Sequence, residues 1–66
     1  MKYTSKELIH ITNIGDILII TADRDMKREE LVGTTINIDG LDILVRGVES
    51  FAKNMINEGD NIGILK

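Results

Sequence analysis

The chain has 66 residues, so we expect a single small domain spanning residues 1–66. It contains no cysteine and one histidine, which excludes disulfide bonds, a thiolate nucleophile and a multi-histidine metal site. The net charge of −3 lacks the basic excess typical of nucleic-acid-binding domains. With one Tyr, one Phe and no Trp the core has to be aliphatic, and the twelve isoleucines favour strands.

The N-terminal part of the chain predicts two strands joined by a turn. We expect residues 1–6 to form a loose extension. Residues 7–12 alternate, which predicts a strand with its isoleucines on one face and His10 on the other. Residues 13–16 read as a turn. Residues 17–21 predict a strand that is apolar on both faces. One face can line the core, and the other needs a second cover, from the protein itself or from a partner.

A polar block, Asp23–Glu30, follows and allows two interpretations. In one, a helix begins after an N-cap at Asp25 and ends before Gly33. In the other, a charged loop leads into a short strand at residues 31–32. The pattern alone leaves both open.

The clearest local signal is the pair Asp39-Gly40 between two alternating runs, which predicts a hairpin. A type I′ turn needs positive φ at both central residues, and these residue types tolerate it. The predicted register places one set of pairs on the core face and leaves Asn37 and Asp42 on the wet face. The core-face pairs are Ile38 with Leu41, Ile36 with Ile43, and Thr34 with Val45.

The C-terminal third predicts two more strands, residues 47–52 and 62–65, with a turn near residues 58–61. Residues 53–58 fit either a strand or a helical turn. About six short strands separated by turns indicate a small barrel or sandwich, and closure would remove exposed sheet edges. The expected fold is therefore all-β, a small closed six-stranded barrel with at most one short helical turn.

Two motifs in this region carry a family resemblance. Gly-Val-Glu-x-Phe-x-Lys begins at Gly47, and Gly-Asp-Asn-Ile-Gly begins at Gly59. Together with Leu31–Ile38 they resemble domain II of the translational GTPases, the elongation factor Tu group. The resemblance covers residues 15 to 66, and it aligns Arg24 with the arginine of the family's Thr-Gly-Arg step.

This resemblance implies a closed six-stranded barrel that acts as a binding module. In the elongation factors, domain II helps to hold the aminoacyl end of tRNA and touches ribosomal RNA. The chain departs from the family at Asp23 and Arg28, which replace glycines, and at Thr34, which replaces an aspartate. The tRNA pocket is therefore not carried over. No Gly-x-x-x-x-Gly-Lys-Ser/Thr phosphate loop is present, so we expect no GTP hydrolysis.

Candidate functional residues fall into three sets. Apolar candidates for an exposed contact patch are Leu18, Ile20 and Leu44. The only basic cluster, interleaved with acidic residues, consists of Arg24, Lys27 and Arg28. Residues expected to shape the fold are Asp39, Gly40, Gly47, Phe51, Gly59 and Gly63.

The functional prediction is non-enzymatic binding, without metal or cofactor. His10 has no partner nucleophile or carboxylate placed by the pattern, so no catalytic role is assigned to it. One alternative is a protein-contact or self-associating module, favoured by the acidic charge and the two-faced apolar strand. The other is an RNA- or ribosome-binding accessory module in translation, as the resemblance implies. With no apolar run long enough to span a membrane, cytoplasmic residence is expected.

Overall fold

The computed structural model describes residues 2–49 and 55–66. Six strands match the six predicted ones, and the chain is mostly β as expected. They are β2 (Glu7–Ile11), β3 (Gly15–Thr21), β5 (Thr35–Ile38), β6 (Leu41–Leu44), β7 (Gly47–Glu49) and β9 (Asn61–Leu65). Three two-residue strands and one short helix complete the described part: β1 (Lys2–Tyr3), β4 (Met26–Lys27), β8 (Met55–Ile56) and α1 (Arg28–Leu31).

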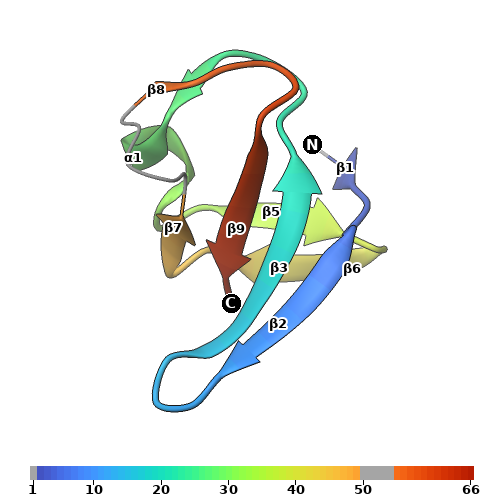
Figure 1. Cartoon of the computed structure of the whole chain (residues 1–66). Coiled ribbons are helices and arrows are strands. Elements are labelled where there is room, and N and C mark those ends of the chain that lie inside the picture. Colours follow the sequence, from blue (N-terminus) through green and yellow to red (C-terminus); the bar gives the residue numbers. More distant parts are fainter. Residues whose placement is uncertain (1, 50–54) are drawn as a thin grey trace.

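The strands form three sheets (Figure 1). The largest is antiparallel, with strand order β2-β3-β9-β7. A second sheet has the order β1-β5-β6, and β4 pairs with β8 in the third. No strand pairing within residues 2–49 and 55–66 closes a sheet into a barrel. The closed barrel therefore stays a prediction.

The core lies between the four-stranded sheet and the β5–β6 hairpin. Apart from Tyr3 and Met26, its described residues are aliphatic, as the composition predicts. Strands β3 and β9 supply the best-buried part, because Leu18 pairs with Ile64 and Ile20 pairs with Ile62 on one face. The remaining members are Ala22, Leu31, Ile36, Ile38, Ile43, Val45, Val48 and Ile56.

The predicted β5–β6 hairpin is confirmed in register. Ile38 pairs with Leu41, and Ile36 with Ile43. Both turn residues have positive φ, 54° at Asp39 and 85° at Gly40, as a type I′ turn requires. Leu41 differs from expectation, because it is exposed although it shares a face with the buried isoleucines.

The polar block combines parts of both interpretations. The chain forms strand β4 and then the single turn of α1, whose N-cap is Lys27 and not Asp25. The Lys27 backbone N–H donates to Glu30 Oε2 at 3.0 Å. Gly33 lies just past the helix with a φ of 85°, as predicted. The expected strand at residues 31–32 is wrong, because Leu31 is helical and buried.

The N-terminal residues are not a loose extension, so that expectation is corrected. Strand β1 pairs in parallel with β5, and Tyr3 is buried. The Asp39 N–H donates to the Tyr3 carbonyl at 2.9 Å. Ser5 donates to the Asp39 carboxylate through both its N–H and its hydroxyl. The predicted turn residue Asp39 therefore also anchors the start of the chain.

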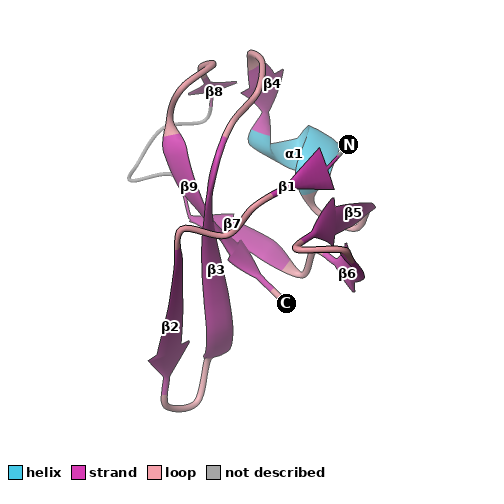
Figure 2. Cartoon of the chain, turned by 90° about the vertical axis from the view of Figure 1, so that its right-hand side faces the viewer, coloured by secondary structure: helices cyan, strands magenta, loops and turns pink. Residues whose placement is uncertain are grey.

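The β2–β3 hairpin projects beyond the rest of the molecule (Figures 1 and 2). Its turn is closed by the Ile14 N–H, which donates to the Ile11 carbonyl at 3.0 Å. Asn13 has a φ of 73° at the third turn position. All five residues of β2 are exposed, so this arm receives little cover from the domain. No helix in the described residues is long and apolar enough to cross a membrane.

Candidate functional site

Strand β3 is apolar on both faces, and the two faces differ in cover. Leu18 and Ile20 point into the core and are 8% and 1% exposed. The expectation that they form an exposed patch is wrong, because alternation shows that two faces exist but not which one meets the core. The outer face instead carries Ile17 and Ile19, which pair with Leu65 and Gly63 of β9.

These outer-face residues line an apolar groove of about 530 Å³, here called the outer groove. It runs along the four-stranded sheet and onto the projecting hairpin. Ile9, Ile11 and Ile14 are 37%, 38% and 47% exposed, so the hairpin side of the groove is open to solvent. The full lining is Ile9, Ile11, Ile14, Ile17, Ile19, Glu49, Gly63 and Leu65.

The groove owes its depth to Gly63. A Cβ on Gly63 would lie 2.8 Å from Ile17 Cγ2 and 3.4 Å from Glu49 Cβ. The side chains of Ile17 and Glu49 can therefore lie this close to β9 only because Gly63 has no side chain. Glu49 is the one charged residue in the lining, and it comes from the edge strand β7. Such a lining can hold apolar side chains.

The opposite face of the hairpin carries His10. Its Nδ1 lies 2.8 Å from Asp16 Oδ1, and the two residues are cross-strand partners in the β2–β3 register. The carboxylate orients the ring, but the His10 side chain is 72% exposed. Because the pair is exposed and joins two paired strands, it is suited to holding the hairpin together.

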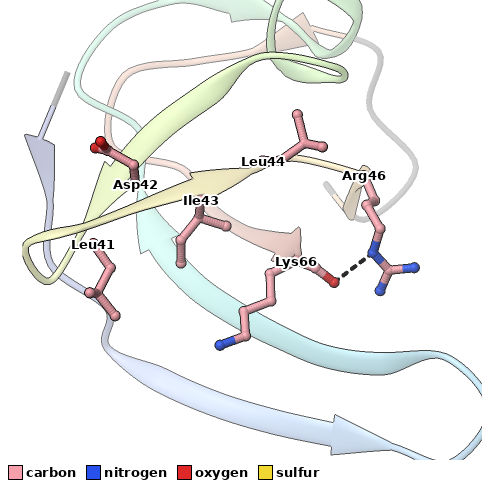
Figure 3. A pocket seen from close by; sticks show the side chains of 6 residues that line it. All are labelled: Leu41, Asp42, Ile43, Leu44, Arg46 and Lys66. Carbon is pink, nitrogen blue, oxygen red and sulfur yellow. Dashed lines mark hydrogen bonds between the residues drawn. The ribbon is translucent and has the colours of Figure 1, made fainter.

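A second hollow of about 480 Å³ lies along β6 and the C-terminal residues (Figure 3). Leu41 and Ile43 point to one side of the strand and Leu44 to the other (Figure 3). Leu44 is 59% exposed, so its predicted exposure is confirmed. Asp42, Arg46 and Lys66 also line this hollow, which makes it more charged than the outer groove.

Arg46 is engaged within the fold. Its Nε donates to the Lys66 carbonyl at 2.6 Å, and its Nη2 donates to the Ile14 carbonyl at 3.3 Å. The backbone N–H of Arg46 donates to the Leu65 carbonyl at 2.9 Å. This arginine therefore ties the end of β9 to the tip of the projecting hairpin.

The basic cluster lies on and beside α1. Arg24 and Lys27 are exposed and Arg28 is half-buried. Acidic neighbours hold this region together: Asp25 Oδ1 accepts the Glu58 N–H at 2.8 Å, and Glu30 accepts the Lys27 N–H. Two carboxylates close to the basic residues in the sequence, those of Asp25 and Glu30, thus bind backbone N–H groups of the local chain.

No known protein family, curated protein or solved structure matches this chain. The resemblance to translation-factor domain II thus stays a prediction.

The glycines singled out from the sequence have different roles. Gly59 lies in the turn between β8 and β9, where its N–H donates to the Ala22 carbonyl at 2.9 Å. Gly47 lies on the outer face, where an added Cβ would meet only Leu65, at an ordinary 3.6 Å. Phe51, which was also expected to shape the fold, lies outside the described residues.

Sequence reasoning missed the Asp16 carboxylate beside His10, and it also missed the bonded pair of Tyr3 and Asp23. The Tyr3 hydroxyl donates to Asp23 Oδ1 at 2.8 Å. Burial, together with this hydrogen bond and the negative charge of Asp23, raises the pKa of Tyr3 to about 12. A lone tyrosine in an aliphatic chain was the available signal, because a buried Tyr hydroxyl usually finds a partner.

Proposed function

We propose that this chain is a non-enzymatic protein-contact module that works through the outer groove and its projecting hairpin. The observation that carries the proposal is the apolar outer face of β2 and β3. Ile9, Ile11 and Ile14 are exposed there beside the buried Ile17. Isolated exposed aliphatic residues are ordinary, whereas a contiguous set around a groove is typical of a contact surface.

Burial of the exposed isoleucines of the hairpin does not by itself supply enough free energy for binding. Burying the exposed parts of the three hairpin isoleucines would stabilise a complex by about 2–4 kcal/mol. Association itself costs about 4–15 kcal/mol in lost freedom. The remaining free energy has to come from the partner's own apolar surface and from backbone hydrogen bonds. We therefore propose that the groove receives aliphatic side chains from a protein segment that lies along the hairpin.

The domain II resemblance is compatible with this proposal and is part of it. In that interpretation the chain is a stand-alone translation-factor domain II-like barrel. What supports it is the resemblance of the motifs that begin at Gly47 and Gly59. RNA or ribosome binding, the alternative drawn from the same resemblance, would use the cluster of Arg24, Lys27 and Arg28.

Affinity purification with two bait variants tests the protein-contact function. Ile11→Asp places a charge in the groove at an exposed position, so the domain should still fold. Thr12→Asp adds the same charge on the neighbouring exposed turn residue, outside the groove lining. We expect one protein to co-purify stoichiometrically with the wild type and with Thr12→Asp, but not with Ile11→Asp.

The same protein, made separately and mixed with the purified chain, has to show the same dependence on Ile11. A wild-type bait that retains only RNA, lost on raising the salt concentration and on Arg24→Glu, would overturn the proposal in favour of the RNA alternative. Equal binding of the partner by Ile11→Asp and Thr12→Asp would show that the partner does not bind in the outer groove.

A further inference from the structure

Strand β2 is an edge strand that lacks the usual protection. Within the described residues it pairs on one side only, with β3, from Glu7–Ile19 to Ile11–Gly15 without a bulge. Natural edge strands are commonly blocked by proline, by a central lysine, by a bulge or by a covering loop. Residues 8–11 contain neither proline nor lysine. The unused backbone groups of this edge are therefore ready to pair with another strand.

The side chains of β2 suit antiparallel pairing with a second copy of themselves. In such a pair, opposite residues lie on the same face, so the two-fold axis passes through one residue. With the axis at His10, Ile9 faces Ile11 of the second copy, and Ile11 faces Ile9. An axis at Ile9 would instead oppose Glu7 with Ile11, and an axis at Leu8 would oppose Glu7 with Ile9.

The charges agree with the axis at His10. On the face of the hairpin opposite the outer groove, each His10 ring lies across from the His10 ring of the second copy. Each ring stays bonded to the Asp16 of its own chain at 2.8 Å. The two rings are thus flanked by two carboxylates. Glu7 lies opposite Asn13, so no two carboxylates face each other. Like charges directly opposite would destabilise such a pair.

The shape of the molecule agrees as well. The hairpin projects from the domain (Figure 2). His10 pairs with Asp16 one position before the end of the β2–β3 register, close to the turn. Two hairpins that overlap near their tips run in opposite directions, which keeps the two domains apart. An unrelated partner strand would have to supply a matching pattern, whereas a second copy supplies it automatically.

We propose that the chain forms a two-fold symmetric dimer through antiparallel pairing of β2 with β2 of a second copy, centred on His10. The two four-stranded sheets become one continuous sheet, and both outer grooves lie on the same face. The dimer rests on the proposed function, because it uses the same hairpin, and it names a second copy as the partner of the β2 edge.

Sedimentation equilibrium of the purified chain tests the dimer. The wild type should show a mass that rises with concentration toward twice the monomer. His10→Lys places two cations opposite each other at the two-fold axis, and a lysine on an edge strand also hinders strand pairing. This variant should weaken dimerisation about five-fold or more. Val32→Lys makes a matched charge change at an exposed apolar residue beside α1, away from the hairpin, and should dimerise like the wild type.

Single-cysteine variants test the register, because the natural chain has no cysteine. His10→Cys puts two thiols across the axis and should cross-link on mild oxidation. Ile9→Cys and Val32→Cys should cross-link more slowly. The proposal is overturned by a wild type that is still a monomer at about 1 mM, or by faster cross-linking of either control. If the monomer still captures another protein through Ile11, the dimer is rejected and the contact function stands.

Discussion

Gly63 and Ile17 are packed so closely that a single methyl group on Gly63 would lie 2.8 Å from Ile17 Cγ2. These residues come from neighbouring strands, β9 and β3, on the outer face of the four-stranded sheet. Ile17 is buried although it lies on that face. The contact therefore sets the floor of the outer groove, and it links the stability of the sheet to the shape of its candidate binding surface.

Replacing Gly63 with alanine should destabilise the fold. Gly63→Ala forces Ile17 to shift, and overpacking of this kind costs about 1–3 kcal/mol. Gly47→Ala is the matched control on the adjacent strand β7, since its Cβ meets only Leu65 at 3.6 Å. Urea unfolding of both variants measures the difference. Equal free energies of unfolding for the two variants would show that Ile17 can move aside for a methyl group at position 63 without cost.

Tyr3 should titrate far above the usual range. Its pKa is raised to about 12, first by burial and then by the hydrogen bond to Asp23. As the sole tyrosine, in a chain without tryptophan, it can be followed by tyrosinate absorbance. Asp23→Asn should lower this pKa while leaving it above 10, because burial remains. A pKa near 10 in the wild type would contradict the buried position of β1.

The same shift makes stability depend on pH in alkaline solution. The folded chain holds the phenolic proton more tightly than the unfolded chain, so the contribution of Tyr3 is complete below pH 10. It should be lost as the pH rises from about 10 to about 12. Tyr3→Phe lacks this proton, and its stability should fall less over that interval. Parallel curves for the two proteins would exclude the linkage.

Asp39 should titrate below its usual range. The Ser5 hydroxyl and then the Ser5 N–H donate to its carboxylate and lower the pKa of Asp39. Its contribution is present above the unfolded pKa and is lost as the pH falls through the lowered value. In Ser5→Ala, NMR titration should find a higher Asp39 pKa, whereas the exposed neighbour Thr4→Ala leaves it unchanged. Equal Asp39 pKa values in Ser5→Ala and Thr4→Ala would show that Ser5 does not lower the pKa of Asp39.

Arg46 should hold the hairpin tip in place. Arg46→Lys loses the fork that reaches both the Ile14 and Lys66 carbonyls, and should cost about 1 kcal/mol. Amide exchange should accelerate in the turn around Ile14 more than in β5. Unchanged exchange at the turn would show that the hairpin keeps its position without this arginine.

Local signals in the sequence were sufficient for several elements. The Asp39-Gly40 turn and the β5–β6 register follow from alternation on either side of two residues that accept positive φ. One of the two interpretations of the polar block placed Gly33 just after a helix for a similar reason, and the structure agrees with it there. These features depend on a few neighbouring residues, so the pattern contains the information.

Contacts between distant segments could not be predicted in this way. Alternation in β3 does not say which face meets the core, so Leu18 and Ile20 were assigned to the wrong side. The parallel pairing of β1 joins Tyr3 to Ile38, which no local pattern encodes. The outer groove was missed for the same reason, since its isoleucines are brought together only by the β2-β3-β9-β7 order.

Amide chemical shifts recorded over a dilution series test the central claim most directly. If the projecting hairpin is a protein-contact surface that pairs with a second copy, the signals of Glu7–Ile11, Ile17 and Ile19 should move with concentration. Those of α1 should stay fixed. Concentration-independent shifts, together with changes at Arg24, Lys27 and Arg28 when RNA is added, would contradict the account.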